Sequence, residues 1–318
     1  MNTEIFLPLL LAFGITAVIG PFLIPYLRRL KFGQTEREEG VKSHLKKAGT
    51  PTMGGIMILA SVIVVSIIFS FMYPRILPVL FLTVAFGVIG FVDDYLKVVL
   101  KRSDGFLPRQ KFLAELIVTT VFMIILLVNN EPGLGVMVPF TGGQIADIGW
   151  LAFPGLYIAV LGTVNAVNFT DGLDGLASSV TVPVAVFFTA ASVLKGTGLA
   201  PIGCAVIGAL LAFLMYNVFP AKIFMGDTGS LALGGFVAGM AYMQNMPVFI
   251  LIVGLIYVIE IVTVMLQVGY FKATHGKRLF KMTPIHHSFE LSGWSEPRIA
   301  AVFTIITIIL CCVGFMAL

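Results

Sequence analysis

The chain has 318 residues, of which 58% are hydrophobic and only 11% are charged, and its mean hydropathy is +1.02. Soluble domains are about 45–50% apolar and about 25% charged, so this composition excludes an ordinary soluble domain. The net charge of +4 is small, and we expect no nucleic acid among the partners.

Apolar residues fall in ten continuous runs, each close to the roughly 20 residues that a bilayer core requires. Continuous runs favour helices over a β-barrel, whose strands would show alternation. We therefore predict an all-α polytopic integral membrane protein with ten transmembrane helices in one domain, residues 1–318. The runs are 5–27, 51–73, 77–96, 112–130, 150–167, 176–194, 199–218, 229–244, 247–270 and 298–317.

Basic residues are concentrated in alternate loops between these runs. Lys and Arg cluster at 28–47, 97–111, 222 and 272–298, and only Arg75 and Lys195 fall elsewhere. Loops rich in Lys and Arg face the cytoplasm. We therefore expect these loops on the cytoplasmic side and both chain termini outside.

The first of these loops, 28–50, leads into the stretch KKAGTPTMGG. Pro51 suits the first turn of a helix, and one interpretation is simply a basic flank followed by a helix start. The other is that Lys47 and Thr52 reach an anionic substrate at this helix start, where free N–H groups favour anions. The residues alone favour neither interpretation over the other.

The third apolar run ends in two adjacent carboxylates, Asp93 and Asp94, and Lys97 follows about one helical turn later. Such a pair can hold Mg²⁺, or one carboxylate can act as a base while the other binds the metal. The alternative is an acidic helix end paired with Lys97. We favour function, because charges at the membrane edge are costly without a ligand. Arg109 and Lys111 begin the fourth run and fit either membrane anchors or phosphate contacts.

Two further segments are informative. Residues 131–149 are rich in glycine with a short alternating apolar pattern, which predicts a small β-hairpin on the outer face. The stretch 165–176, NAVNFTDGLDGL, places Asn168, Asp171 and Asp174 between two apolar runs. Glycine follows each aspartate and lets the backbone approach a bound group. We interpret this stretch as a polar catalytic loop at the cytoplasmic membrane surface.

Residues 217–230, NVFPAKIFMGDTGS, connect the seventh and eighth runs. Asn217 ends one helix and Asp227 opens the next, where a capping role would be ordinary. Phe224 fits either an exposed interfacial anchor or a platform that stacks on a nucleobase. A cap would account for one aspartate, but five lie at helix ends on the same membrane face: Asp93, Asp94, Asp171, Asp174 and Asp227.

The ninth run carries Glu260 near its middle, and the last cytoplasmic loop, 271–298, carries His286 and His287. An intramembrane carboxylate is a functional candidate, but Glu260 also fits a hydrogen bond to a neighbouring side chain, so we assign it no role. Two adjacent histidines do not chelate one metal as an i,i+4 pair would. Near a phosphate they suit hydrogen bonding or proton transfer; taken alone, His286 fits a solvated loop histidine slightly better.

Five motifs together resemble one family, the phospho-N-acetylmuramoyl-pentapeptide transferases (the MraY family), within the polyprenyl-phosphate N-acetylhexosamine-1-phosphate transferases. The family's histidine run is often three residues long, whereas Ser288 occupies the third position here, which leaves His286 and His287. The motifs are TPTMGG (50–55), FVDDYLK (91–97), NAVNFTDGLDGL (165–176), NVFPAKIFMGDTGS (217–230) and PIHHSFE (284–290).

The resemblance implies ten helices in the bacterial plasma membrane, outer termini, a homodimer and a Mg²⁺-dependent cytoplasmic site. It implies that UDP-N-acetylmuramoyl-pentapeptide reacts with undecaprenyl phosphate to give lipid I and UMP, a step of peptidoglycan and cell-wall synthesis. It also implies binding of uridine-type nucleoside inhibitors.

The resemblance further implies roles for individual residues. Asp93 is similar to the family's base for the lipid phosphate and, with Asp94, forms its acidic pair, while Asp227 resembles the principal Mg²⁺ ligand, with Asp94 as a second ligand. Asn168, Asp171, Gly172 and Asp174 resemble the nucleotide loop and Phe224 the uracil platform. The polar groups around the pyrophosphate and uridine are implied to be Lys47, Thr52, Lys97, Lys111, Asn217, His286 and His287.

Phosphoryl transfer depends mainly on positioning and charge neutralisation, which agrees with this set of carboxylates and cations. We predict an apolar groove for the prenyl chain near the fifth and ninth runs, where Ala159, Gly162 and Gly254 are small. Two alternatives stay open. One is an undecaprenyl-phosphate N-acetylglucosamine-1-phosphate transferase, and the other is a secondary transporter, whose charges should lie near the bilayer midplane.

Overall fold

The computed structural model describes residues 3–30, 47, 49–102, 105–129 and 135–318. Parts of the predicted 28–50 loop and of the 131–149 segment, namely 31–46, 48 and 130–134, lie outside these described residues, as do 103–104.

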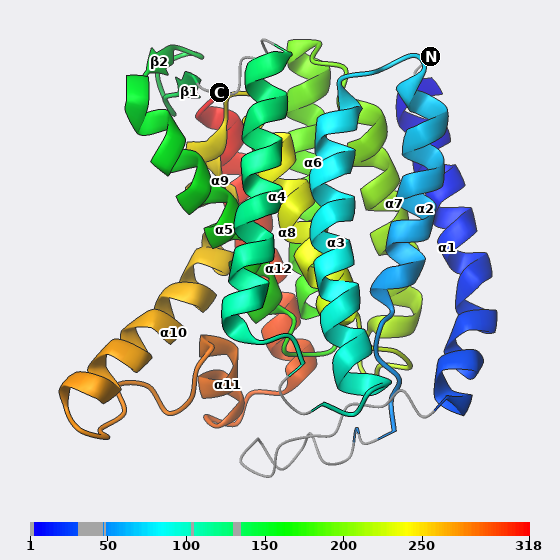
Figure 1. Ribbon diagram of the computed structural model, residues 1–318, viewed down its shortest axis with the longest axis vertical. Helices are drawn as coiled ribbons and strands as arrows, with labels where there is room; N and C mark the ends of the chain where they lie inside the picture. The colour runs from blue at the N-terminus through cyan, green and yellow to red at the C-terminus, as the bar shows by residue number, and fades with distance from the viewer. Residues whose placement is uncertain (1–2, 31–46, 48, 103–104, 130–134) are drawn as a thin grey trace.

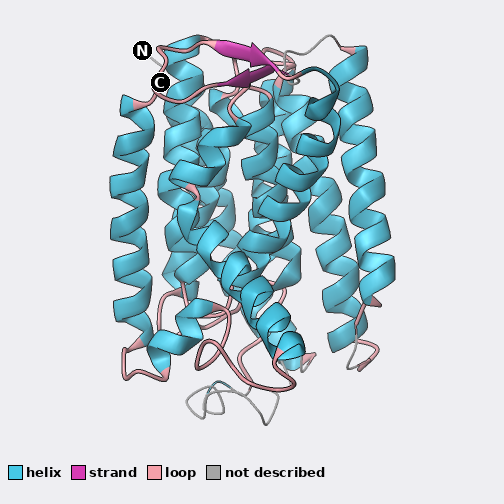
Figure 2. Cartoon of the chain, turned by 90° about the vertical axis from the view of Figure 1, so that its left-hand side faces the viewer, coloured by secondary structure: helices cyan, strands magenta, loops and turns pink. Residues whose placement is uncertain are grey.

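The described chain is a bundle of long, roughly aligned helices with a two-stranded hairpin at one end (Figures 1 and 2). The two strands are β1 (Gly135–Met137) and β2 (Ile145–Asp147), with short 3-10 helices η2 (Gly149–Leu151) and η3 (Pro247–Phe249). The α-helices are α1 (Thr3–Arg29), α2 (Gly55–Ser70), α3 (Ile76–Val98), α4 (Pro108–Val128), α5 (Ala152–Thr170), α6 (Leu176–Lys195), α7 (Ala200–Asn217), α8 (Gly226–Tyr242), α9 (Ile250–Val253), α10 (Leu255–Ala273), α11 (Ile285–Glu290) and α12 (Glu296–Met316).

Each of the ten predicted apolar runs contains a helix. Eight helices of the described chain are long and apolar enough to cross a membrane, namely α1, α3, α4, α5 with η2, α6, α7, α10 and α12. The second run, α2, is apolar but only 16 residues long, and α8 has 17 residues.

Helix α8 forms the core of the bundle, where it packs against α3, α5 and α2. It is buried on all sides from Thr228 to Tyr242. Glycine makes this close packing possible. A methyl group at Gly234 would overlap the backbone of Val164 in α5, and one at Gly90 in α3 would overlap the backbone of Asp227. These small residues therefore bring the N-terminus of α8 directly against the end of α3.

The ninth predicted run, 247–270, is not one continuous helix. It is divided into η3, α9 and α10, with a break at Gly254, whose φ of −101° and ψ of 19° are not helical. After the break, α10 leans away from the bundle, as its oblique course in Figures 1 and 2 shows.

The predicted hairpin is confirmed within its described part, since β1 and β2 pair antiparallel with Val136 opposite Ala146. Both termini lie at this end of the bundle (Figure 1). The motif-bearing ends of α3, α5, α7 and α8 meet at the opposite end. The motif-bearing ends therefore lie together at one end of the bundle, and the side of the membrane that this end faces stays a prediction.

Candidate active site

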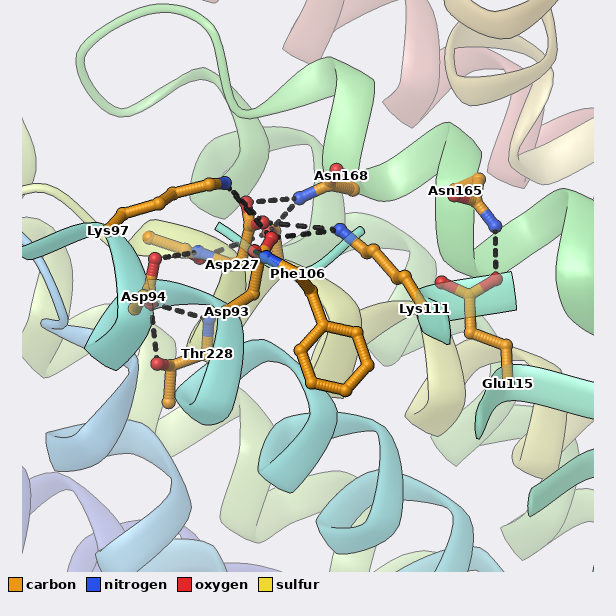
Figure 3. A network of polar contacts seen from close by, with 12 residues as sticks. Asp93, Asp94, Lys97, Phe106, Lys111, Glu115, Asn165, Asn168, Asp227 and Thr228 are labelled. Carbon is orange, nitrogen blue, oxygen red and sulfur yellow. Dashed lines mark hydrogen bonds and ion pairs between the residues drawn. The ribbon is translucent and has the colours of Figure 1, made fainter. Parts of the chain in front are cut away.

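Two aspartates and two lysines form a compact network at the end of α3 and the start of α8 and α4 (Figure 3). Lys97 Nζ lies 2.9 Å from Asp93 Oδ2 and 3.1 Å from Asp227 Oδ2. Lys111 Nζ lies 3.4 Å and 3.2 Å from the same two oxygens. The Asp93 Oδ1 atom accepts a hydrogen bond from Phe106 N at 2.7 Å. Each ammonium group is thus shared between two carboxylates from distant parts of the chain.

Asp94 faces away from these lysines and binds the N-terminus of α8. Its Oδ1 accepts the N–H of Asp227 at 3.1 Å, and its Oδ2 accepts the N–H and hydroxyl of Thr228 at 2.9 and 2.6 Å. A carboxylate at this position satisfies N–H groups that the helix leaves unpaired. The capping interpretation of Asp227 is therefore wrong, because Asp227 lies in the first turn and Asp94 satisfies that turn instead.

The predicted catalytic loop contributes Asn168 and Asp171 to the same site. Asn168 Nδ2 donates to Asp227 Oδ1 at 2.9 Å and to Ser230 Oγ at 2.8 Å. Burial, together with the neighbouring charges of Asp227 and Asp94, raises the pKa of Asp171 well above its ordinary range. The negative charge of Asp171 is thus unfavourable beside these carboxylates unless a cation joins them.

A second network lies beside the first and centres on Asp174. Lys47 Nζ contacts Asp174 Oδ1 at 2.7 Å and Glu296 Oε2 at 2.6 Å, and the other Asp174 oxygen accepts the N–H of Ala221 at 2.8 Å. Burial alone would lower the pKa of Lys47, but these contacts raise it. The ammonium group also lies 5.9 Å from the Phe224 ring centroid, a distance at which a cation and an aromatic face attract.

The sequence interpretation of the segment at 50–55 is wrong in two respects. Helix α2 begins at Gly55, and Pro51 lies before it, where its carbonyl accepts the N–H of Phe224 at 2.8 Å. The N–H groups of Gly54 and Gly55 donate to Phe224 and Met225 carbonyls, so they do not offer an anion site. Thr52 is buried with its Oγ1 unpartnered within the described chain.

Other predicted site residues have different surroundings from those expected. Asn217 is buried, donates to the Ile223 carbonyl at 3.0 Å and accepts the Ser178 hydroxyl at 3.3 Å, so it shapes the loop that follows α7. Phe224 is half-buried. The interpretation of Phe224 as an exposed interfacial anchor is therefore wrong.

His286 is fully buried, so the interpretation as a solvated loop histidine is wrong. It lies in α11, and its Nδ1 is 3.0 Å from Glu260 Oε2. His287 Nδ1 is 2.7 Å from Glu290 Oε2. Ser288, the departure from the family's histidine run, exchanges hydrogen bonds with the backbone of Met282 at 3.1 and 2.6 Å and so closes the loop before α11.

Three carboxylates were not assigned from the sequence. Glu115 accepts a hydrogen bond from Asn165 Nδ2 at 3.0 Å near Lys111 (Figure 3), and its position one turn after Lys111 was an available signal. Glu296 contacts Lys47, and Glu260 contacts His286. Neither of these two pairings has a sequence signal, because each joins segments that only the fold brings together.

The predicted apolar groove is present between α5 and α10. A cavity of about 470 Å³ is lined by Ala159 and Gly162, and a second of about 1100 Å³ is lined by Gly162, Lys111 and Asn168. Gly254 does not line either cavity. Because Ile158, Gly162 and Ile261 line both, the apolar space continues along α5 to the Lys111 end of the charged network.

The carboxylates of the charged network meet part of what a Mg²⁺ site requires. Within the described residues, no three His, Cys, Asp or Glu side chains are gathered into a complete metal site. Mg²⁺ does not require one, because it is commonly held by one or two carboxylates with waters and substrate phosphates. The Asp227 side chain is 19% exposed, against 4% for Asp93, so Asp227 is the accessible carboxylate at this point.

Comparisons with known proteins identify related chains. Residues 76–245 match the model described as glycosyl transferase family 4, and residues 47–59 match the phospho-N-acetylmuramoyl-pentapeptide-transferase signature 1. A protein of Acetivibrio thermocellus named phospho-N-acetylmuramoyl-pentapeptide-transferase is 48% identical over 97% of this chain and 94% of its own length. Proteins of the same name from Caldicellulosiruptor bescii and Clostridium novyi are 46% and 47% identical, over 98% and 97% of this chain and 96% and 95% of their own lengths.

Proposed function

The chain belongs to the phospho-N-acetylmuramoyl-pentapeptide-transferase family, and from this premise we propose how its residues carry out the transfer. The enzyme moves phospho-N-acetylmuramoyl-pentapeptide to a lipid carrier in peptidoglycan synthesis. The family assignment replaces both alternatives, the N-acetylglucosamine-1-phosphate transferase and the transporter. The substrates we propose are UDP-N-acetylmuramoyl-pentapeptide and undecaprenyl phosphate.

The reaction exchanges one phosphorus–oxygen bond for another. A phosphate oxygen of the carrier attacks the phosphorus atom that bears the sugar, and a new pyrophosphate bond forms. The bond from that phosphorus to the bridging oxygen breaks, and the electron pair leaves with UMP. Such transfers depend mainly on alignment and on neutralising the charge of the phosphoryl oxygens.

Lys97 and Lys111 are the groups we propose to bind the phosphate oxygens. Both ammonium groups lie within 3.4 Å of the same pair of carboxylate oxygens, so they converge on one small volume. Ammonium groups in that volume can contact both the attacking and the leaving phosphate. When they do, the Oδ2 atom of Asp93 is freed to accept a proton from a singly protonated carrier phosphate, which is the base role proposed for Asp93.

Asp227 is the residue we propose as the principal holder of Mg²⁺, with Asp171 beside it. The raised pKa of Asp171 supports this, because a divalent cation would relieve the repulsion that raises it. When bound, the ion would neutralise phosphate charge and polarise the phosphorus–oxygen bonds. Asp94 was also predicted as a ligand, but its hydrogen bonds to α8 favour a role in positioning Asp227.

We place the uridine part of the nucleotide at the second network. Phe224 offers a half-buried aromatic face beside Lys47, and a nucleobase stacks on such a face. The loop that carries Asp174 and Gly172 would border the ribose. Uridine-type nucleoside inhibitors would occupy the same place, and Thr52, Asn217 and His287 remain predicted contributors to its walls.

The carrier's prenyl chain would lie in the cavities along α5 and α10. Their walls are mostly apolar, and the larger cavity reaches Lys111 and Asn168, both of which contact Asp227. A lipid in this space would present its phosphate to the charged network. This continuity of apolar cavity and charged network is the observation that carries the proposal.

The placement in the membrane completes the proposal. We propose that α2 and α8 also cross the bilayer, giving ten spans, because a helix of 16 or 17 residues still rises about 25 Å and α8 is shielded from lipid by its neighbours. The site then lies on the cytoplasmic side of the bacterial plasma membrane with both termini outside, and the protein acts as a homodimer.

Purified protein tests the proposal directly. With Mg²⁺ and undecaprenyl phosphate, it should release UMP from UDP-N-acetylmuramoyl-pentapeptide and not from UDP-N-acetylglucosamine. UMP release only from UDP-N-acetylglucosamine would contradict the assignment. Solute movement across vesicles without UMP formation would favour a transporter instead.

A further inference from the structure

Glu260 and His286 form a buried pair outside the charged network. Glu260 lies within α10, His286 lies in the short helix α11, and both side chains are fully buried. A carboxylate within a membrane helix is costly and is retained mainly where it has a partner and a function. His286 is that partner, at 3.0 Å, so the pair fixes α11 against the lipid-facing helix α10.

The contact determines how the imidazole is oriented. An ionised carboxylate only accepts hydrogen bonds, so an ionised Glu260 places the ring proton on Nδ1, toward itself. The opposite atom, Nε2, is buried and has no hydrogen-bond partner within the described residues. A polar atom left in this way is unfavourable in a folded protein, and it calls for a functional reason.

Nε2 points at the nucleotide loop. A methyl group added at Gly172 would overlap Nε2 of His286, so the ring lies directly against that glycine. Gly172 follows Asp171, whose backbone N–H donates to the Asn168 carbonyl at 3.2 Å, and Asn168 Nδ2 in turn donates to Asp227 Oδ1 at 2.9 Å. A chain of contacts therefore leads from Glu260 through His286 and Gly172 to the carboxylates of the charged network.

We propose that Glu260 is a positioning residue for the transfer reaction. It holds the His286 ring in one orientation and one tautomer, with Nε2 against Gly172, and the ring in turn holds the Asp171–Asp174 loop in register with Asp227. The proposal rests on the proposed function of this site. Glu260 acts through His286 and does not itself contact substrate.

A double-mutant cycle tests this dependence. Glu260→Gln retains a hydrogen-bond acceptor but removes the charge. We expect it to lower kcat about tenfold or more, the size of loss seen when the carboxylate behind a metal-bound histidine is removed. The KM for undecaprenyl phosphate should change little. The double variant Glu260→Gln/His286→Gln should be no slower than His286→Gln alone, because residues that act as a unit are not additive.

Thr263→Val is the matched control. Thr263 lies one turn from Glu260 on α10, is buried, and its hydroxyl donates to the Glu260 carbonyl at 2.9 Å. The kcat of the Thr263→Val variant should stay within about twofold of that of the unmodified enzyme. An unchanged kcat for Glu260→Gln, or losses that multiply in the double variant, would overturn the proposal.

A spectroscopic measurement reads the His286 ring in the unmodified protein, and a variant is needed only for assignment. The chain has four histidines, so ¹⁵N-histidine labelling of the unmodified protein, with His286→Gln for assignment, resolves the His286 ring. Its proton should be on Nδ1, and an Nε2–H tautomer would overturn the proposal. This result does not depend on substrate, whereas a failure of the unmodified enzyme to release UMP would count against the proposed function alone.

Discussion

The replacement Asp227→Asn should abolish most transfer activity while leaving the fold intact. Asparagine has the same shape as aspartate, and its amide oxygen can still accept the hydrogen bond from Asn168. What it removes is one negative charge, shared by Lys97 and Lys111, at the carboxylate that we assign to Mg²⁺.

The size of the effect follows from the contacts. At an effective dielectric constant of about 20, unit charges at the 3.1 and 3.2 Å of Lys97 and Lys111 attract by about 5 kcal/mol each. Desolvation offsets most of this, and charge-assisted hydrogen bonds contribute a net ~1.5–3 kcal/mol each. In the transition state this charge would face the proposed Mg²⁺, whose double charge we count as two such interactions, and their loss would slow turnover by about 10²–10⁴-fold.

The assay is UMP release by purified protein at saturating substrates over a series of Mg²⁺ concentrations. Asp147→Asn is the control, because Asp147 lies in β2 at the opposite end and is exposed; its turnover should be unchanged. Thermal unfolding of each variant should confirm that it is folded at the assay temperature. If Asp227→Asn turned over within tenfold of the unmodified enzyme at ordinary Mg²⁺, the assignment of Asp227 would be refuted.

Four other variants probe the remaining parts of the site. Asp93→Asn should lower kcat more than nucleotide affinity, and a pure loss of affinity would remove Asp93 as the base. Phe224→Ala should weaken binding of uridine-type inhibitors by about 1–3 kcal/mol in a calorimetric titration; unchanged binding would exclude stacking. Because the raised pKa of Asp171 makes its charge unfavourable in the fold, Asp171→Asn should raise the unfolding midpoint in Mg²⁺-free buffer at about pH 8, with no gain below about pH 3, where aspartate is protonated in both states. Gly90→Ala should destabilise the protein by about 1–3 kcal/mol, because the methyl group would overlap the Asp227 backbone; an unfolding midpoint equal to that of the unmodified protein would argue against this contact.

The sequence was sufficient to predict the helices and to predict that the motifs meet at one end of the bundle. Continuous apolar runs predict helices because each must satisfy its own backbone in a membrane. Their number and the placement of basic residues then bring Asp93, Asp171 and Asp227 to one end of the bundle. The match of five ordered motifs identified the family, which the comparisons confirm.

What the sequence could not supply was the direction of individual side chains. Asp93 and Asp94 are adjacent and chemically identical, yet one faces the lysines and the other the N-terminus of α8. Successive residues on a helix point about 100° apart. Only the position of α8 decides which carboxylate contacts the lysines and which one contacts the N-terminus of α8. The start of α2 was missed for a similar reason, because the backbone before Gly55 pairs with Phe224 and Met225, a contact between distant segments.

The position of Lys111 explains why chemistry on two immiscible substrates can occur at one place. Its Cα belongs to the first turn of α4, its ammonium group contacts Asp93 and Asp227, and its side chain also lines the larger apolar cavity. A long lysine side chain can cover apolar surface while its charge stays in a polar region. Lys111 therefore spans the boundary between the apolar cavity and the charged network, which is where we propose that the carrier phosphate meets the sugar phosphate.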